Sequence, residues 1–406
     1  MPLKIAIVGG GPVGLTLARI LLTAPSNIDV TIFESDASAS SRTTRGGTLD
    51  LRPGTGLAAI DAAGLRPGFD LVARSDPESS GIILADRQGK IVFEKPVNAD
   101  EPNTSPEIDR IDLRTLLLDG LPDTAVRWGA RLASIAPDGT MSFANGAPDV
   151  DTSQFDLIVG AEGAWSKVRA HIAPSTPGPR YSGIGVLEMY VSAEDAERVG
   201  LARVVKGGLY LSMGSRQVLT GQRVKSGAYM FYAGIPTESV EEFKAFWKSC
   251  GGDQARVRDR FRALYEAKGW APELLAWFDV ARLGDMRAWP LYEYELPDGH
   301  VWEHKKGWTL VGDAAHVMTP FAGEGVNAGM RDALELAKRL RALGDGDGEA
   351  LDAAVKEYEE EMFARLRPLM LESLTNKASY YHEKAPDSVL EKLRAALSKY
   401  EVAQVV

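Results

Sequence analysis

Residues 3–14, with the sequence LKIAIVGGGPVG, decide the fold. Residues 3–8 form a β-favouring apolar run, which is typical of a buried parallel strand. The run leads directly into residues 9–14, in which Gly9, Gly11 and Gly14 have the spacing G-x-G-x-x-G, and residues 15–22 predict an apolar helix. The order of strand, glycine turn and helix is that of a dinucleotide-binding unit, so an α/β protein with a Rossmann-like domain is expected.

Each glycine of this turn has a separate task in a dinucleotide site. Gly9 permits the tight turn, Gly11 lets a pyrophosphate approach the backbone, and Gly14 lets the helix pack closely on the strand. The helix N-terminus offers free N–H groups and a partial positive charge to the phosphates. A second strand is expected over 29–33, and Glu34 at its end can accept hydrogen bonds from ribose hydroxyls. An acid at this position favours an unphosphorylated ribose, as in FAD or NAD.

The bulk composition narrows the class of protein. The 406 residues allow two domains or one large elaborated domain, and 45% apolar with 25% charged residues is typical of a soluble globular protein. The net charge of −10, with no basic tract, argues against nucleic-acid binding. Cys250 is the single cysteine, so no intrachain disulfide or thiolate metal cluster is expected. No signal peptide and no membrane-spanning run is recognised, and a cytoplasmic location is expected.

A second stretch, residues 308–327, specifies which dinucleotide is bound. A short apolar strand leads into Gly312-Asp313, a tight turn reaches Pro320, and a glycine-rich segment precedes a helix that begins near Asn327. A third stretch, over 156–161, is another apolar strand, followed by Glu162-Gly163-Ala164-Trp165-Ser166-Lys167-Val168-Arg169. Together with the N-terminal fingerprint, these segments indicate a flavin.

Here the sequence resembles the class A flavoprotein monooxygenases, the aromatic hydroxylase group. Residues 162–169 resemble the family's Asp-Gly segment, in which Ser166 and Arg169 match but Glu162 replaces the usual aspartate. The segment Gly312-Asp313 resembles the family's Gly-Asp segment. The resemblance implies that Asp313 binds the ribityl chain of FAD, and it places Glu162 among the cofactor-binding residues. His316 also matches a common position, where a structural role in the turn is favoured over an acid–base role.

The resemblance also implies where oxygen transfer takes place. Pro320 matches the proline at the edge of the flavin ring near the reacting oxygen, so Pro320 and Gly325 are expected to form the catalytic surface. The loop whose backbone meets the isoalloxazine ring is matched by Gly323, Gly325, Val326 and Asn327. A helix N-terminus beside this loop can stabilise negative charge near flavin N1.

Within this group, residues 44–51 and 312–327 look most like the tetracycline-inactivating flavin monooxygenases. That likeness implies FAD contacts from Asp50, Arg45 and Gly47. Arg114, in the helix opened by residues 107–114, matches the arginine that reaches FAD, whereas the neighbouring Arg110 can be a surface charge. Arg287, just before Trp289-Pro290-Leu291, matches the family's arginine before a Pro-Leu pair.

The resemblance predicts a Rossmann-like FAD-binding domain with an inserted β-sheet substrate domain and a long C-terminal bridging helix. The expected ranges are 1–73, 106–181 and 281–343 for the FAD-binding domain, 74–105 and 182–280 for the substrate domain, and 350–406 for C-terminal helices. In the substrate domain, strands are expected over 183–191, 208–213 and 227–234, and a helical stretch from 239 to about 268. The expected substrate-binding residues are Glu188, Met230, Tyr232, Phe321 and Gly323, although the first three can equally belong to the core or surface of the sheet.

The implied activity is that of a single-component monooxygenase. NADPH or NADH docks transiently and reduces FAD, O2 gives a flavin C4a-hydroperoxide, and a phenolic or enolic polycyclic substrate, tetracycline-like or another polyketide, is hydroxylated. No second dinucleotide unit and no redox cysteine pair are found, and no metal is required. The alternatives are an FAD-dependent oxidase or dehydrogenase and a non-catalytic flavin-binding accessory protein. The expected partners are a small aromatic or polycyclic substrate and O2, without nucleic acid or membrane, and the chain is expected to be a monomer or weak dimer.

Overall fold

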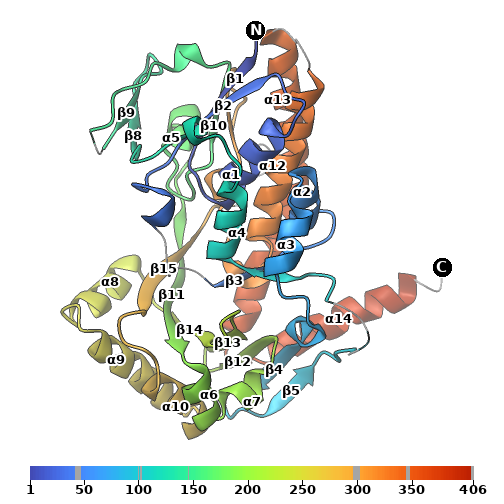
Figure 1. Ribbon diagram of the computed structural model, residues 1–406. Coiled ribbons are helices and arrows are strands. Elements are labelled where there is room, and N and C mark those ends of the chain that lie inside the picture. The colour runs from blue at the N-terminus through green and yellow to red at the C-terminus, as the bar shows by residue number, and fades with distance from the viewer. Residues whose placement is uncertain are drawn as a thin grey trace. The chain divides into compact units, whose positions relative to one another are not determined.

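The computed structural model describes residues 1–41, 47–98, 100, 103–144, 146–295, 302–343 and 348–403, with side chains to residue 395 (Figure 1). Contacts between Cα atoms divide the chain into two compact units. The first unit contains Met1–Ala73, Glu107–Arg180 and Tyr292–Ser373, and the second contains Arg74–Pro106, Tyr181–Leu291 and Leu374–Val406. Each unit is therefore built from segments that lie far apart in the sequence.

A five-stranded parallel sheet forms the centre of the first unit. Its order is β16-β10-β1-β2-β7, with bounds Trp308–Leu310, Leu157–Gly160, Leu3–Val8, Ile28–Phe33 and Val126–Arg127. The strands expected over 3–8, 29–33 and 156–161 are present, each within one residue of its expected ends. The parallel pairing of these strands confirms the predicted mixed α/β fold with a Rossmann-like sheet. Buried apolar strands of this kind are typical of sheets that helices cover on both faces.

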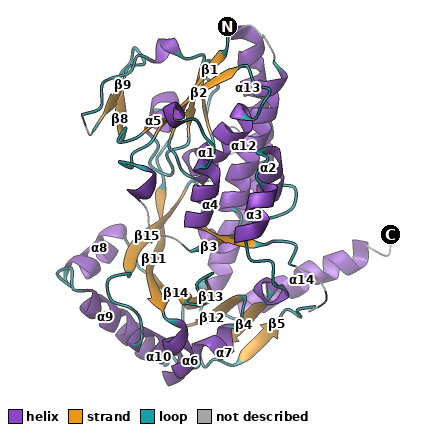
Figure 2. Ribbon diagram, in the orientation of Figure 1, coloured by secondary structure: helices purple, strands orange, loops and turns teal. Residues whose placement is uncertain are grey.

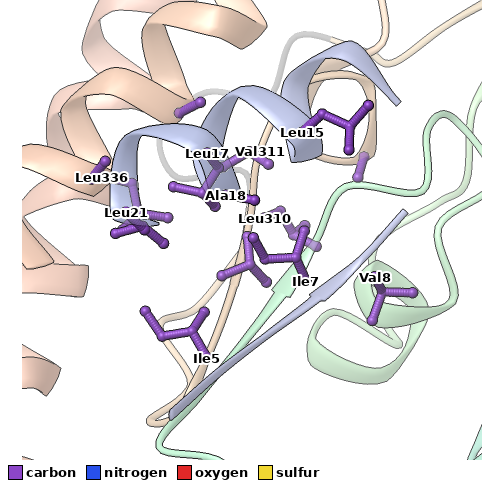
Figure 3. Packing of buried hydrophobic residues seen from close by; sticks show 14 of the residues in the cluster. Ile5, Ile7, Val8, Leu15, Leu17, Ala18, Leu21, Leu310, Val311 and Leu336 are labelled. Atoms are coloured by element: carbon purple, nitrogen blue, oxygen red, sulfur yellow. The ribbon is translucent and has the colours of Figure 1, made fainter. Parts of the chain in front are cut away.

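The helix α1 (Pro12–Leu22) covers the strand β1 through a close apolar contact (Figure 3). Leu17, Ala18 and Leu21 of α1 belong to the same buried cluster as Ile5 and Ile7 of β1. Gly14 makes this approach possible, since a Cβ atom there would lie 2.1 Å from the carbonyl oxygen of Gly9. The helix α12 (Gly325–Ala342) joins the cluster, so the two segments expected to bind the flavin share one core.

The remaining elements of the first unit surround this core. The helices are α2 (Gly56–Ala62), α3 (Arg66–Val72), α4 (Arg110–Leu118), α5 (Lys167–Ile172), α11 (Asp313–His316) and most of α13 (Gly348–Tyr380). Two small antiparallel pairs join β3 (Thr48–Asp50) to β6 (Glu107–Asp109) and β8 (Leu132–Ile135) to β9 (Met141–Phe143). The first pair brings residues 48–50 beside the start of α4, which is expected to supply a cofactor-binding arginine.

A seven-stranded sheet lies largely in the second unit (Figure 2). Its order is β15-β11-β14-β13-β12-β4-β5, with bounds Arg287–Glu293, Arg180–Val191, Tyr229–Pro236, Gln217–Arg223, Leu209–Gly214, Ile82–Asp86 and Ile91–Glu94. One face of the sheet is apolar and packs against helices α6 (Ala193–Arg198), α7 (Leu201–Val205), α8 (Val240–Lys248), α9 (Gln254–Glu266) and α10 (Pro272–Asp279). The strand β13 lies outside the strand segments expected in this region.

The helical stretch predicted from 239 to about 268 is interrupted. It consists of two helices, α8 and α9, with Gly251 and Gly252 between them at φ angles of 64° and 80°. Only glycine adopts such angles without strain, so this pair ends one helix and lets the chain turn into the next.

The C-terminal part is helical, as expected. The long helix α13 spans Gly348–Tyr380, and α14 spans Asp387–Ala403. The sequence analysis set residues 350–406 apart, whereas the contacts assign α13 to the first unit as far as Ser373 and the following residues to the second unit. Among the described helices, none is both long and apolar enough to cross a bilayer.

Candidate functional site

The glycine turn after β1 is held by Glu34. Its Oε2 atom accepts a hydrogen bond of 2.6 Å from the N–H of Gly10, and its Oε1 atom accepts one of 2.8 Å from the N–H of Asp36. The Glu34 side chain is buried, and the bond to Gly10 is shielded from water. The sequence predicts a ribose contact for Glu34. The structure shows it fixing the turn, and its contact with a nucleotide stays a prediction.

The start of α1 has the features of a phosphate site. Gly11 is the N-cap residue, no described side chain caps the helix, and an added Cβ atom at Gly11 would meet no described atom within 4 Å. The first N–H groups of the helix therefore keep their hydrogen-bonding capacity, which suits a pyrophosphate. Gly9 and Gly14, by contrast, are required by packing: a Cβ atom on Gly9 would lie 2.5 Å from the oxygen of Ala161.

Arg114 lies buried beside this turn. Its Nη2 atom is 3.0 Å from an oxygen of Asp36, and its Nη1 atom donates to the carbonyl oxygen of Gly10 over 3.4 Å. Its guanidinium also lies 5.7 Å from the ring centre of Trp128. The side chain thus ties α4 to the glycine turn, and its direct contact with FAD stays a prediction.

Asp313, at the start of α11, carries a carboxylate close to other protein atoms. Desolvation raises its pKa, while the charges of His316 and Arg110 act in the opposite direction. The side chain nevertheless remains accessible to solvent. A carboxylate in this position can accept hydrogen bonds from the hydroxyl groups of a ligand. Arg110, which the sequence analysis treated as a possible surface charge, is near enough to influence Asp313. The N–H of Arg110 also donates to Gly47 over 3.2 Å.

The Gly312-Asp313 turn is fixed from beneath by Asp332 of α12. This fully buried carboxylate accepts hydrogen bonds from the N–H of Gly312 (2.9 Å), Nε2 of His316 (2.5 Å) and Nη2 of Arg365 (2.9 Å). Burial opposes its ionisation, but the charges and hydrogen bonds of His316 and Arg365 and the N–H of Gly312 outweigh burial, so the pKa of Asp332 lies below its ordinary value. His316 is buried and engaged, as a residue that holds the turn would be. Asp332 and Arg365 were not predicted from the sequence.

The loop before α12 is tied to the strand β3. The buried Asn327 accepts a 2.9 Å hydrogen bond from the N–H of Arg52 and donates one of 2.9 Å to the carbonyl oxygen of Asp50. Arg52 forms ion pairs with Asp50 (3.0 Å) and with Glu324. Five predicted site residues, Asp50, Gly323, Gly325, Val326 and Asn327, therefore lie in one connected region. Arg52 and Glu324 were missed.

The backbone of this loop is open. Gly323 has a φ angle of 66°, a Cβ atom on Gly325 would meet no described atom within 4 Å, and Pro320 is exposed. No described side chain caps the N-terminus of α12, so its first N–H groups are available to a negative charge. Thr319, just before Pro320, is hydrogen-bonded to Ser373 of α13 over 2.8 Å, which anchors the loop.

The segment after β10 shows why a glutamate can stand at position 162. The Oε1 atom of Glu162 accepts a 2.9 Å hydrogen bond from the N–H of Val168, and the N-cap Ser166 accepts one of 2.8 Å from the N–H of Arg169. Glu162 thus binds the first turn of α5. Its other oxygen is buried and has no hydrogen-bond partner among the described residues, and burial raises its pKa. A cofactor contact of Glu162 stays a prediction.

Arg169 connects α5 to the Gly312-Asp313 segment. Its Nη1 atom donates to the carbonyl oxygen of Ala315 over 2.8 Å, and its guanidinium lies 3.8 Å from the ring centre of Tyr294. Burial, above all, raises the pKa of Tyr294 to about 12, so this phenol stays protonated near neutrality. The two predicted flavin segments are therefore joined through one buried arginine.

The predicted substrate residues fall in both units. In the second unit, Glu188 is buried and ion-paired with Arg287, Met230 is also buried, and Tyr232 lies directly opposite Glu188 in the pairing of β11 with β14. Phe321 and Gly323 lie on the loop of the first unit. Their contacts with a substrate stay predictions. Arg45 lies outside the described residues.

The first unit has the features that FAD requires. It combines an uncapped helix N-terminus behind an open Gly11, an accessible carboxylate at Asp313 and a second uncapped helix N-terminus at Gly325. Phosphates, ribityl hydroxyls and a flavin ring that gains negative charge need groups of these kinds. Among the described residues, no group of three or more His, Cys, Asp or Glu side chains could hold a metal ion.

Comparisons with known proteins agree with this site. The FAD binding domain family matches residues 3–261 and 301–372. Monooxygenase penA of Penicillium thymicola is 33% identical over 430 residues, which cover 95% of this chain and 97% of that protein. 3-Amino-4-hydroxybenzoate 2-monooxygenase PtmB3 of Streptomyces platensis is 28% identical and covers 96% of this chain and 91% of that protein.

Solved structures share the fold at lower identity. A salicylate hydroxylase substrate complex superposes with a TM-score of 0.74 at 19% identity, covering 98% of this chain and 93% of that chain. HpxO of Klebsiella pneumoniae, complexed with FAD and uric acid, gives 0.72 at 21%, covering 97% and 92%. The tetracycline destructase Tet(51) gives 0.68 at 17%, covering 99% and 98%. On the strength of the family match and the relatives, the chain belongs to the FAD binding domain family and is a class A, FAD-dependent flavoprotein monooxygenase.

Proposed function

We propose that this monooxygenase hydroxylates an electron-rich phenolic or enolic polycyclic compound, tetracycline-like or another polyketide. NAD(P)H, the transient donor typical of the family, gives up a hydride. One atom of O2 enters the substrate as a hydroxyl group on carbon. The other leaves as water, which takes up the two electrons and the proton of the hydride and one further proton from solvent. The observation that carries the proposal is the network of Asn327, Asp50 and Arg52, which fixes the open loop before α12.

Bound FAD supplies the redox chemistry, by accepting the hydride and passing electrons to O2. The chain's own residues position and stabilise. The N-terminus of α1 behind Gly11 receives the pyrophosphate, and Asp313 accepts hydrogen bonds from ribityl hydroxyls. The first N–H groups of α12, from Gly325, face developing negative charge without reorganisation. Pro320 provides a rigid wall that helps exclude water from the reacting atoms.

The proposal needs no dedicated base on the protein. Phenols and enols ionise readily, and His316 is held by Asp332 in a buried pair rather than presented to a ligand. Substrate names support the aromatic class: one relative is a 3-amino-4-hydroxybenzoate 2-monooxygenase, and tetracycline destructases share the fold. The single buried Cys250 supports the cytoplasmic location that we also propose.

A screen with the FAD-loaded enzyme tests the proposal. NADPH and NADH oxidation and O2 uptake are measured with tetracyclines, other fused-ring polyketides and simple phenols, and products are identified by mass. We expect a product heavier by one oxygen atom with at least one polycyclic phenol or enol. An oxygenated product from another polyketide, with none from tetracyclines, would rule out a tetracycline-like substrate. Reduced cofactor consumption without any oxygenated product from the whole panel would contradict the proposal.

A further inference from the structure

The two faces of the second unit's sheet differ in character. Along β11 and β14 the odd-numbered residues, such as Met189 and Phe231, are buried in the apolar cluster beneath the helices. Side chains alternate between faces along a strand, so the even-numbered residues project from the opposite face. On β15, Ala288 packs against the cluster, which leaves its two neighbours for the opposite face. We call the group on that face the polar face; it consists of Glu188, Tyr232, Arg287 and Trp289.

A buried carboxylate organises the polar face. Glu188 is 2% exposed, and its Oε1 atom accepts hydrogen bonds from Nε (3.1 Å) and Nη2 (2.6 Å) of Arg287. Taking a carboxylate out of water is costly unless it is paired, so Glu188 requires this partner. The bond pair holds the Nε side of the guanidinium and fixes its plane, although the Arg287 side chain is itself 42% exposed.

The fixed guanidinium keeps unused donors. An arginine has five N–H groups, and Glu188 takes one from Nε and one from Nη2. Within the described residues, Nη1 of Arg287 makes no hydrogen bond, so its two N–H groups and the second N–H of Nη2 remain. These lie along the edge of the fork away from Glu188, where two parallel donors can meet two oxygens of one planar group.

Aromatic rings lie beside the guanidinium. The guanidinium of Arg287 lies 5.5 Å from the ring centre of Trp289, and the ring of Tyr232 meets that of Trp289 edge-on at 6.2 Å and 90°. Trp289 and Tyr232 are both partly exposed. A flat ligand with an anionic pair of oxygens therefore finds a fork and an aromatic surface together, on three neighbouring strands of one sheet.

We propose that Arg287 determines specificity by binding two adjacent oxygens of an anionic aromatic or enolic substrate, either a carboxylate or an ionised enol beside a carbonyl. Trp289 contacts the substrate ring, and Glu188 is the positioning residue that orients Arg287. This inference rests on the proposed function, since it names the substrate class for the same reaction. Lysine in place of arginine would keep the charge beside Glu188 but lose the fork.

Binding to the oxidised, FAD-loaded enzyme tests the inference without turnover. Two matched probes, 1-hydroxy-2-naphthoate and 1-naphthol, are titrated while the flavin absorbance and the tryptophan fluorescence are recorded. We expect wild-type protein to bind the naphthoate at least about tenfold more tightly than naphthol, since hydrogen bonds to charged groups are strong. In Arg287→Lys this preference should fall by about tenfold or more, with naphthol binding unchanged. The control is Arg198→Lys, an exposed arginine ion-paired with Asp195 on α6.

The outcomes separate the inference from the function on which it rests. Equal naphthoate binding by wild type and Arg287→Lys, or no naphthoate binding by wild type, would overturn the inference. Equal losses in Arg287→Lys and Arg198→Lys would overturn it as well. If NADPH oxidation still yields an oxygenated product from uncharged phenols in such a case, the proposed function stands. If Arg287→Lys loses the preference for naphthoate but the screen yields no oxygenated product, the binding role of Arg287 is supported and the proposed hydroxylation is contradicted.

Discussion

Replacing Asp332 by asparagine perturbs the network that orients the Gly312-Asp313 turn. The carboxylate receives three donors on two oxygens: Gly312 N–H and His316 Nε2 on Oδ2, and Arg365 Nη2 on Oδ1. Asparagine has nearly the same shape but a single acceptor oxygen. The amide NH2 group must therefore take the place of one carboxylate oxygen, where it faces a group that can only donate a hydrogen bond.

The size of the effect follows from burial. Asp332 is completely inaccessible, so water cannot replace the lost acceptor. Breaking a buried ion pair by removing one partner costs about 3–5 kcal/mol, and we expect about 3 kcal/mol because Arg365 retains Glu361 as a partner at 2.9 Å. For a unit of this size, that corresponds to a fall of roughly 6–12 °C in the melting temperature. The loosened turn should also weaken FAD binding by about tenfold, or about 1.4 kcal/mol.

Thermal unfolding of the FAD-free protein and FAD titration measure the two effects separately. The matched control is Asp70→Asn, which removes an exposed partner of Arg66 on α3 and should cost at most about 1 kcal/mol. The pKa of Asp332 is depressed, so its stabilisation is present above the ordinary value of 3.8 and is lost as the pH falls through the folded-state pKa. The reasoning fails if Asp332→Asn melts within the range of Asp70→Asn and binds FAD as wild type does.

Two further predictions concern the glycine turn and the partly buried His304. Gly11→Ala should leave the melting temperature of the FAD-free protein unchanged, because a Cβ atom there meets no described atom, yet it should weaken FAD binding about tenfold or more. Gly14→Ala should lower the melting temperature itself, since its Cβ atom would lie 2.1 Å from the carbonyl oxygen of Gly9. Equal melting temperatures for the two variants would count against this account. Burial lowers the pKa of His304, but the hydrogen bonds that its ring donates to Glu359, at 2.7 Å, and to a second carboxylate outweigh burial and raise the pKa. The stabilisation is therefore complete below the unfolded-state value of 6.5 and is lost as the pH rises through the folded-state pKa. The melting-temperature difference between wild type and His304→Gln should accordingly be larger at about pH 6 than at about pH 9, and a difference independent of pH would disprove the charge-based explanation.

The sequence predicted the parallel sheet well because local patterns determine its strands. An apolar run that ends in glycine, as at Val8 and Gly9, has few other structural solutions. The strand β13 was missed because its polar residues and Gly221 interrupt any clear alternation. The helical stretch after 239 was drawn too long because the break depends on the backbone angles of Gly251 and Gly252.

The site was predictable where a residue acts through a motif, and not where it acts through a distant contact. Asn327 and Asp50 belong to recognisable motifs, but Arg52 and Glu324, which join them, are ordinary surface-type residues in the sequence. Arg52 reaches Glu324 and Asn327 across more than 270 positions of sequence, and no local pattern reports such a pairing. Asp332 was hidden for the same reason, since an acid in an amphipathic helix usually faces solvent, as the neighbouring Glu335 could equally suggest.

The strand order β16-β10-β1-β2-β7 affects how the chain can fold as it leaves the ribosome. The strands β1 and β2 emerge first, but β16 of the same sheet is not synthesised until residues 308–310. At about 5–20 residues per second, roughly 15–60 s pass between the synthesis of β1 and that of β16, which completes the sheet by pairing with β10. The nascent chain thus presents an incomplete sheet to chaperones for most of its synthesis, and truncation before α12 should yield an aggregation-prone fragment rather than a smaller FAD-binding domain.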